Sequence, residues 1–415
     1  MGRGMALGRI CDGGAAMKPM RIAFLHPNLG LGGAERLIVD AARALQQVGH
    51  KTTIFTSRYD PESAFAETRE LDVRVVPTRV PESIGGRFLA PATILRMRRI
   101  ANKLASERGA YDVVVCDLTA HVIPDLQRSL AVPVAFYCHY PDSLLTSRPN
   151  TGIYGSYRKG IDASERRGLE AADCVMVNSA FTARRYVEEF QGIEPPHVVY
   201  PGADVEAYQG ISPIQASGEI LLLSVNRFRA PKALDRAVGA LAALPSFIAD
   251  QTWKRVRLVL AGGYEESLPD ARETVAGLKG QVERLGLVGK VDWVFNPSEP
   301  ERLALLGRAR CLLYTPSDEH FGLGPIEAMA AARPVVAVNS GGPLETIVEG
   351  ETGRLRSPEP DALAEGLSVY VESPETAREH GLAGRIRVAR HFSLDRFRDS
   401  LEQILGSLVS ERTAT

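Results

Sequence analysis

Short apolar segments rich in β-branched residues alternate with longer segments of helical periodicity along most of the chain. Near-continuous apolar strands that alternate with helices are typical of parallel sheets covered on both faces. The first series of predicted strands comprises residues 21–26, 52–57, 73–76, 112–116, 132–138, 174–178 and 197–200, and the second comprises residues 220–225, 257–261, 291–295, 311–314 and 335–338. The pattern predicts an α/β protein with two doubly wound, Rossmann-like sheets.

A turn-rich stretch separates the two series of predicted strands. Residues 200–204 and 210–218 contain turn-forming residues and few periodic apolar positions. We therefore predict one domain over residues 20–205, a second over residues 215–390 and a C-terminal helix within residues 391–415. Ligands bind beyond the carboxyl ends of the strands in such sheets, so two domains that face each other would form a site in the cleft between them. Residues 1–19 precede the first strand pattern and are expected to be a disordered extension.

Composition and charge exclude several classes of function. The chain has 415 residues, of which 45% are hydrophobic and 24% charged, as in an ordinary globular protein. Its 49 Lys and Arg residues balance 50 Asp and Glu residues, so no global field would attract nucleic acid. The five cysteines are scattered singly, which argues against a disulfide framework or a zinc site and favours a reducing cytoplasm. No apolar run approaches the roughly 18 residues that cross a bilayer, and no signal peptide is recognisable.

The first predicted strand runs into a turn that contains Gly30, Gly32 and Gly33 and then into a helical pattern. Glycines at such a turn let the backbone approach a ligand, and the helix N-terminus presents free N–H groups to anionic oxygens. The spacing matches neither GxGxxG nor the GxxxxGK[ST] phosphate loop. The loop is therefore equally compatible with a tight turn that has no ligand.

Two cations follow the first strand of the second series. Arg227 and Lys232 fall at the carboxyl end of that strand, where a guanidinium and an ammonium group can hold the two phosphates of a diphosphate. The simpler alternative is a pair of solvated surface cations.

Two glutamates flank a glycine-bearing turn later in the second series. Glu319 and Glu327 are eight residues apart, and Gly322 and Gly324 lie between them. Both carboxylates can therefore face one ligand across the turn, where they would accept hydrogen bonds from sugar or ribose hydroxyls. Capping of the following helix alone would explain Glu327, but it does not explain Glu319 and the two glycines together.

In chain order, these features resemble the retaining GT-B glycosyltransferases of family 4. The resemblance rests on residues 32–35 (Gly-Gly-Ala-Glu), on Arg227 with Lys232, and on Glu319 and Glu327 with Phe321-Gly322-Leu323 between them. It covers nearly all of residues 20–400. It implies the GT-B fold, in which two Rossmann-like domains face a cleft, with the acceptor on the first domain and the nucleotide sugar on the second. It also implies that the C-terminal helix crosses back to the first domain.

Four further segments, residues 136–142, 157–162, 177–182 and 199–202, resemble the α-1,3/α-1,6-mannosyltransferase family of the dolichol-linked oligosaccharide pathway. That family uses GDP-mannose and a lipid-diphosphate-linked acceptor. The resemblance implies a retaining transfer of mannose from GDP-mannose to a polyprenyl-diphosphate-linked or other glycan acceptor, with no cofactor.

The resemblance also assigns roles to single residues. It implies that Arg227 and Lys232 bind the donor diphosphate, that Glu319 binds hydroxyls of the donor sugar and that Glu327 binds the ribose. The backbone amides of Phe321, Gly322 and Leu323 would contact the phosphates or the sugar, and Gly32 and Gly33 would form the loop where acceptor and donor meet.

His139 stands at a predicted strand end, and the resemblance implies that it contacts the transferred sugar and helps the transition state. As a lone histidine it is equally compatible with a structural hydrogen bond. The residues assigned to catalysis are His139, Glu319, Arg227 and Lys232. The two cations would stabilise the leaving diphosphate without a metal, and the resemblance implies that the leaving phosphate accepts the acceptor proton on the same face of the sugar.

A basic amphipathic helix is predicted over residues 92–108. Its apolar side holds Ile94, Met97, Ile100, Ala101 and Leu104, its basic side holds Arg96, Arg99 and Lys103, and Arg87, Arg98 and Arg108 lie nearby. Such a helix is typical of peripheral contact with anionic lipid on the cytoplasmic face of a membrane, or of a core-packed helix with a solvated basic side.

Three other functions share features with this sequence. A GT-B enzyme that uses a UDP-sugar, either a glucosyltransferase or a hydrolysing epimerase, would have the same fold. A non-catalytic protein that binds nucleotide sugars would not need both glutamates and both cations. A nicotinamide-dependent dehydrogenase would open one half with GxGxxG, and neither half does.

Overall fold

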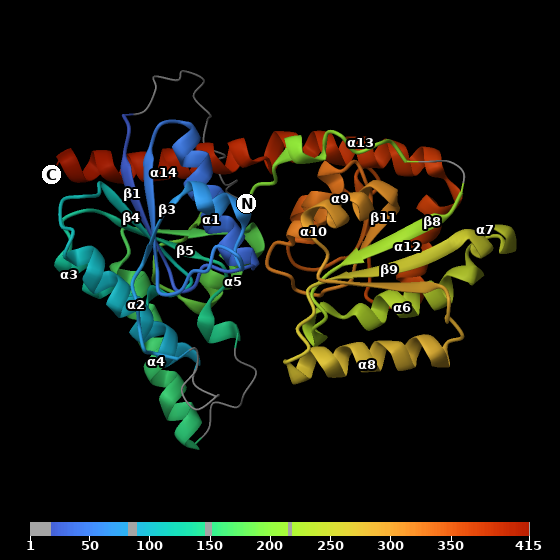
Figure 1. Ribbon diagram of the computed structural model, residues 1–415, viewed down its shortest axis with the longest axis horizontal. Coiled ribbons are helices and arrows are strands. Elements are labelled where there is room, and N and C mark those ends of the chain that lie inside the picture. The colour runs from blue at the N-terminus through green and yellow to red at the C-terminus, as the bar shows by residue number, and fades with distance from the viewer. Residues whose placement is uncertain (1–17, 82–88, 146–151, 215–217, 415) are drawn as a thin grey trace, which may run out of the picture.

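The computed structural model of the protein describes residues 18–81, 89–145, 152–214 and 218–414. The predicted N-terminal extension lies outside the described residues except for Lys18 and Pro19, and Arg87 also lies outside them. Within the described part of the chain, two parallel sheets account for the named strands (Figure 1). No helix in that part is long and apolar enough to cross a membrane.

The first sheet has seven strands in the order β3-β2-β1-β4-β5-β6-β7. They are β1 (Arg21–His26), β2 (Lys51–Thr56), β3 (Asp72–Val75), β4 (Val113–Asp117), β5 (Val134–Cys138), β6 (Cys174–Val177) and β7 (His197–Val198). The chain adds β2 and β3 on one side of β1 and then returns to its other side with β4. The switch in strand order therefore lies between β1 and β4, which is where ligands bind in doubly wound sheets.

Helices cover both faces of the first sheet. The helices and short 3₁₀ turns are α1 (Gly33–Gln47), η1 (Ala66–Glu70), α2 (Leu89–Ala105), η2 (Ala120–Val122), α3 (Ile123–Ser129), η3 (Asp142–Leu145), α4 (Gly152–Ala171) and α5 (Ala180–Glu189). On one face, apolar residues of α2 such as Met97 and Leu104 pack against Leu25 and Val114. On the other, Ile38 of α1 lies in the apolar cluster that contains residues of β1. Burial on both faces explains why these strands are almost entirely apolar.

The second sheet has six strands in the order β10-β9-β8-β11-β12-β13. They are β8 (Ile220–Val225), β9 (Val256–Gly262), β10 (Val291–Phe295), β11 (Ala309–Tyr314), β12 (Val335–Val338) and β13 (Gly353–Arg356). Strands β8 and β11 are paired in parallel at the switch in strand order. This sheet therefore repeats the arrangement of the first, with its switch point beside the predicted cations.

The helices and 3₁₀ turns that follow β7 belong mainly to the second sheet. They are η4 (Val205–Tyr208), η5 (Ala230–Lys232), α6 (Leu234–Ala243), η6 (Leu244–Ser246), α7 (Asp250–Arg255), α8 (Pro269–Arg284), α9 (Glu299–Arg308), α10 (Leu323–Ala330), α11 (Pro343–Thr346), α12 (Pro360–Glu372) and α13 (Pro374–His391). Several begin with local signals. Helix α9 has a capping box between Ser298 and Glu301, and the Ser373 hydroxyl accepts a hydrogen bond from the Thr376 amide at the start of α13.

The last helix, α14 (Leu394–Ala414), leaves the second sheet and lies against α1 of the first (Figure 1). Phe397, Leu401 and Leu405 of this helix are buried in the apolar cluster that includes Ile22 and Ile38. Strand β1 and the last helix are thus packed into one apolar cluster of the first domain.

The prediction for the basic helix is corrected in one respect. The apolar side of α2 is buried in the core of the first domain, as the core-packed alternative requires, because Ile100 and Leu104 belong to its apolar cluster. Arg96 is not on the basic outer side: it is 3% exposed and donates a hydrogen bond to the Thr93 hydroxyl. Arg99 remains exposed.

Candidate functional site

The switch point of the second sheet brings together three of the predicted site residues. Arg227 follows β8 directly, Lys232 ends the turn η5, and Glu319 lies in the loop after β11. The ammonium group of Lys232 forms an ion pair with the Glu319 carboxylate. The Thr315 hydroxyl also donates a hydrogen bond to the Lys232 carbonyl at 3.0 Å, which ties the two loops together. Adjacent strands therefore place both cations and one glutamate at the same edge of the sheet.

The loop from Glu319 to helix α10 is held by a further glycine, Gly342, which was not predicted from the sequence. The amide of Gly342 donates to the Glu319 carbonyl at 2.7 Å. A Cβ atom on Gly342 would lie 2.1 Å from the Phe321 carbonyl oxygen, so only glycine permits this approach. Gly322 has a φ of +88° and caps α10, whose first residue is Leu323. The first N–H groups of a helix lack partners within it, so they are available to a ligand near Glu319.

Glu327 is placed in the first turns of α10, where it forms an ion pair with Arg302 of α9. Arg302 also bonds Glu299 and the Tyr208 hydroxyl. Burial disfavours the charged form of Arg302. Glu327 and the other partners of Arg302 outweigh this effect and raise its pKa above the ordinary value. The ion pair with Arg302 therefore fixes the orientation of the Glu327 side chain, which remains a quarter exposed.

The switch point of the first sheet holds three linked side chains, of which only His139 was predicted. Asp117 ends β4 and is fully buried. It accepts hydrogen bonds from His26 Nδ1, at the end of β1, at 2.6 Å and from His139 Nε2, just beyond β5, at 2.8 Å. One carboxylate thus orients two imidazole rings from the strands on either side.

The interactions among Asp117, the two histidines and Glu35 offset the cost of burying charged side chains. Burial favours the neutral carboxylic acid, but the two histidines outweigh it and lower the pKa of Asp117 to about 2. For His26, burial favours the neutral imidazole, whereas the bond to Asp117 and the nearby Glu35 raise its pKa to about 9. Glu35 lies 4.0 Å from His26 Nε2, and its pKa is lowered because this partner outweighs burial. At neutral pH the first switch point therefore holds a buried imidazolium between two carboxylates.

The predicted glycine turn brings the two switch points together. Gly32 is the N-cap of α1, and a Cβ atom there would lie 3.1 Å from Nη2 of Arg227 and 2.1 Å from a carboxylate oxygen of Glu35. Because Gly32 has no side chain, the N-terminus of α1 in the first domain can lie close to the Arg227 guanidinium of the second domain. Gly33, the first residue of α1, has open space beside it.

The residues next to His139 and Glu319 join the domains by a ring stack. Tyr140 and His320 have ring centroids 3.8 Å apart and planes inclined by 3°. The Ser179 hydroxyl also donates to the His320 carbonyl at 2.5 Å. Because Tyr140 follows His139 and His320 follows Glu319, this stack places the two predicted catalytic residues on opposite sides of one contact.

A second contact between the domains was also missed from the sequence. Glu345, on α11, accepts hydrogen bonds from the amides of Ala180 and Phe181 at 2.8 and 2.5 Å, at the N-terminus of α5. It also accepts one from the Tyr200 hydroxyl at 2.9 Å. A carboxylate from the second domain thus caps a helix of the first, where the helix dipole favours negative charge.

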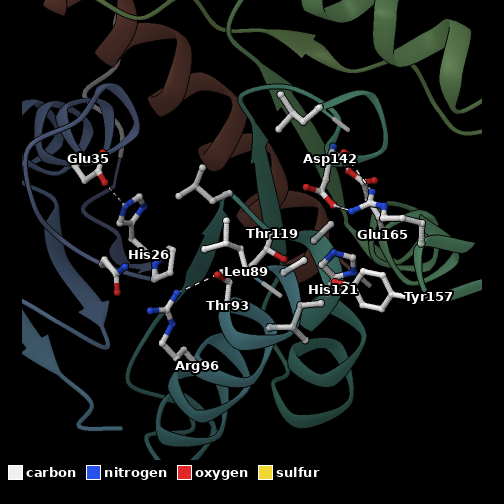
Figure 2. Close-up of a pocket in the computed structure, with 18 residues that line it drawn as sticks. His26, Glu35, Leu89, Thr93, Arg96, Thr119, His121, Asp142, Tyr157 and Glu165 are labelled. Carbon is white, nitrogen blue, oxygen red and sulfur yellow. Dashed lines mark hydrogen bonds and ion pairs between the residues drawn. The ribbon is translucent and has the colours of Figure 1, made fainter. Parts of the chain in front are cut away.

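A cavity of about 520 Å³ opens beside His26 in the first domain (Figure 2). Its walls come from the loops after β1, β4 and β5 and from helices α2 and α4. They include His26, Glu35, Thr93, Arg96, Thr119, His121, Asp142, Tyr157, Arg158 and Glu165, with the exposed leucines Leu89, Leu118 and Leu145. This cavity was not predicted from the sequence, because its walls come from segments that are distant in the chain.

Comparison with known proteins gives consistent matches over both domains. A family model described as "Glycosyltransferase Family 4" matches residues 31–207, and one described as "Glycosyl transferases group 1" matches residues 211–387. The α-1,3/1,6-mannosyltransferase ALG2 of Mus musculus is 39% identical over 400 residues, which are 94% of this chain and 96% of the mouse protein. The same enzyme of Homo sapiens is 40% identical over 402 residues, with the same two coverages.

The fold is also found among solved structures. A sucrose-phosphate synthase from Thermosynechococcus elongatus superimposes with a TM-score of 0.78 and 22% identity, over 94% of this chain and all of the other. The GT-B architecture of two Rossmann-like sheets that was expected from the sequence is confirmed.

Proposed function

This chain belongs to the α-1,3/1,6-mannosyltransferase family within the group 1 and family 4 glycosyltransferases, and on that premise we propose that it transfers mannose from GDP-mannose to a lipid-diphosphate-linked glycan. The resemblance inferred from the sequence is confirmed by these matches. The observation that carries the reaction is the meeting of the two switch points, which joins Arg227, Lys232 and Glu319 of one domain to Gly32 and His139 of the other.

The donor lies on the second domain in this proposal. Arg227 and Lys232 bind its diphosphate. When the donor binds, Lys232 gives up part of its contact with Glu319 and contacts a phosphate instead. Glu319 then accepts hydrogen bonds from hydroxyls of the mannose, while Glu327, oriented by Arg302, binds the ribose. The amides of Phe321, Gly322 and Leu323 contact the phosphates or the sugar.

The leaving group is stabilised by charge that is already in place. Negative charge develops on the diphosphate as the glycosidic bond breaks, and Arg227, Lys232 and the N-terminus of α1 at Gly32 and Gly33 all face that position. Since these groups supply the positive charge, we expect transfer to proceed without a divalent metal. The mannose keeps its anomeric configuration, with the acceptor proton passing to the leaving phosphate on the same face of the sugar.

The first domain supplies orientation. Asp117 holds His139 by a hydrogen bond to Nε2, which leaves the Nδ1 edge of the imidazole for the donor sugar. The Tyr140–His320 stack keeps His139 close to Glu319. His139 therefore contacts the transferred mannose in the closed form, and Asp117 acts as its positioning residue.

The acceptor approaches from the first domain, where the cavity beside His26 and Glu35 is found. Leu89, Leu118 and Leu145, which also line it, remain 64%, 42% and 59% exposed. Exposed leucines beside a polar cavity suit an acceptor with a polar head and a lipid chain. The exposed cations Arg99 and Lys103 of α2 would favour peripheral contact with anionic lipid on the cytoplasmic face of a membrane.

A donor panel tests the proposal. Purified protein is incubated with a synthetic lipid-diphosphate-linked glycan and either GDP-mannose or UDP-glucose, and the product is analysed by mass spectrometry. We expect transfer from GDP-mannose, unchanged by a chelator, and thermal stabilisation by GDP-mannose. Equal or faster turnover of UDP-glucose would instead support the UDP-sugar alternative, and binding without any turnover would support a non-catalytic protein.

A further inference from the structure

We propose that the cavity in the first domain binds neutral sugar units of the acceptor through the side chains of Thr119 and His121, and that the acceptor diphosphate lies outside it. This inference rests on the proposed function, because it assigns one part of the same acceptor to one part of the enzyme. It goes beyond that function by naming the chemistry that the cavity recognises.

The first support is a set of polar atoms that line the cavity without a hydrogen-bond partner among the described residues. They include Oγ1 of Thr119 and Nδ1 of His121. Their residues are 7% and 6% exposed, so bulk water does not compensate them. Buried polar atoms are nearly always hydrogen-bonded in native proteins, and two such atoms in one cavity wall indicate a ligand that supplies the missing partners.

The second support is the state of the charged side chains in the same wall (Figure 2). Arg158 donates to Asp142 at 3.1 Å and to Asp162 at 2.6 Å. Glu165 accepts from the amides of Asp142 and Ser143 at 2.7 and 3.1 Å.

Of the other cations in the wall, His26 lies between the carboxylates of Asp117 and Glu35. Arg96 donates to the Thr93 hydroxyl. The cations of the wall thus have acceptors within the protein, which lowers their attraction for a diphosphate.

His121 is a neutral hydrogen-bonding group at physiological pH. Burial, together with the nearby Arg158 and Arg98, outweighs the effect of Asp142 and lowers its pKa to about 4. A neutral imidazole nitrogen and a threonine hydroxyl pair well with sugar hydroxyls, which both donate and accept. The unpartnered hydroxyl of Thr119 and ring nitrogen of His121 therefore favour a neutral ligand rich in hydroxyl groups over an anion.

The position of His121 is fixed by close packing. It lies on the turn η2, and helix α4 crosses this turn at Gly168, where a Cβ atom would lie 2.1 Å from the Ala120 carbonyl oxygen. The absence of a side chain at Gly168 lets the helix lie directly on the turn. The wall is thus built rigidly around the cavity, whose volume is within the roughly 300–1,000 Å³ of small-molecule sites.

The test uses two variants of the full chain and a matched control. Thr119→Val removes the hydroxyl with almost no change in shape, and His121→Phe removes the ring nitrogens. Thr346→Val is the control, because the Thr346 hydroxyl is also buried without a partner but does not line the cavity. Neither threonine variant breaks a hydrogen bond of the protein, so both should melt at or above the wild-type temperature.

Two measurements are made on each protein. The first is the KM for the lipid-linked acceptor and for GDP-mannose. The second is ligand NMR, with proton saturation transfer to a water-soluble mannose oligosaccharide and phosphorus line broadening for inorganic diphosphate. We expect Thr119→Val and His121→Phe to raise the acceptor KM about five- to tenfold, the loss of one hydrogen bond, with an unchanged donor KM. Their NMR signal from the oligosaccharide should fall, that from diphosphate should stay, and Thr346→Val should match the wild type in both.

Three outcomes would overturn the inference. They are no oligosaccharide signal from the wild-type protein, equal signals in the wild type and Thr119→Val, or loss of diphosphate binding in the two cavity variants. Failure of the proposed function looks different, because the wild type would then transfer no mannose while the NMR comparison could still be made.

Discussion

His139 Nε2 lies 2.8 Å from an oxygen of Asp117, a carboxylate that is entirely buried and that holds His26 with its other oxygen. A residue predicted to touch substrate is thus oriented by one that the solvent does not reach. The consequences of breaking this link follow from the charges involved.

Asp117→Asn should reduce kcat and lower the pKa of His26. In the wild type, burial opposes the charge on His26, but Asp117 and Glu35 raise its pKa to about 9 from 6.5. When the charge of Asp117 is removed, the effect of burial on the His26 ring is less opposed, so the pKa of His26 falls. NMR titration of the His26 ring checks the shift, and a value that stays near 9 in the variant would contradict the assignment.

Asp117→Asn should also lower the free energy of unfolding, and by more at low pH than at high pH. A raised pKa means that the contribution of His26 to the free energy of unfolding is fully present below about pH 6.5 and is lost as the pH rises through about 9. The difference in free energy of unfolding between the wild type and Asp117→Asn should therefore shrink between these pH values. Denaturant titrations at several pH values measure it.

Arg227→Ala and Lys232→Ala should each lower kcat/KM roughly 10- to 100-fold while the protein stays folded, since a charge-assisted contact to the leaving group contributes about 1.5–3 kcal/mol. Steady-state kinetics with GDP-mannose measure the effect. The matched control is Arg229→Ala, because Arg229 is an exposed cation of the same loop that pairs with Asp270. If both site variants keep the rate of this control, the diphosphate is bound elsewhere.

Glu319 and Glu327 should respond differently to amide substitution. Glu319→Gln should mainly reduce kcat, because hydroxyl contacts near the breaking bond change in the transition state, and it should keep GDP affinity. Glu327→Gln should weaken binding of both GDP and the donor. Calorimetric titration with GDP beside kinetics separates the two.

Glu299→Gln serves as the control for Glu327, since Glu299 shares the partner Arg302 but is 60% exposed. A Glu319 variant that loses GDP binding and retains kcat would show that the two roles are reversed.

Glu345→Ala should loosen the contact between the domains. It leaves the amides of Ala180 and Phe181 and the Tyr200 hydroxyl without their acceptor, at a cost of roughly 1–3 kcal/mol for each group that stays buried. We expect a larger radius of gyration by small-angle scattering and a higher donor KM. Glu351→Ala, at an exposed glutamate nearby, should change neither; an unchanged scattering curve for Glu345→Ala would refute the role of this contact.

Reversing the exposed cations of α2 should weaken binding to anionic vesicles. Arg96 is excluded from this test because it is buried, so the variant combines Arg99→Glu and Lys103→Glu. Cosedimentation with vesicles that contain phosphatidylserine measures the effect, and Arg272→Glu with Arg284→Glu on α8 is the control. Equal sedimentation of both variants would mean that the basic side of α2 is only solvated.

The sequence predicted the strands of both sheets with one omission. The missed strand β13 reads Gly-Arg-Leu-Arg, so it has one large apolar residue and no recognisable run. Predicted ends differed from the observed ends by up to two residues, as at β5, which begins at Val134 rather than at residue 132. Strong apolar patterning thus located nearly every strand, whereas an edge strand held mainly by its backbone left no such pattern.

The candidate site could be predicted where the signal was local. The cations, Glu319 and the glycine turn lie within short segments beside predicted strands, and they lie close together in the structure. Glu327 instead pairs with Arg302. Asp117 could have been found, because it directly follows a strand predicted to end at residue 116, and a polar residue at a strand end is a usable signal. Glu345 could not, because its partners are about 145 to 165 residues away. The burial of Arg96 likewise depends on a cavity wall that no helical periodicity reveals.

The return of α14 to the first domain has a consequence for biosynthesis. A chain that leaves the ribosome from its N-terminus presents Ile22, Ile38 and their apolar neighbours hundreds of residues before Phe397 and Leu405, which cover them. The first Rossmann-like unit therefore emerges with an uncovered apolar face, and it is completed only after the second unit has been translated. The first half of this enzyme therefore reaches its final stability only at the end of synthesis, although it has its own sheet.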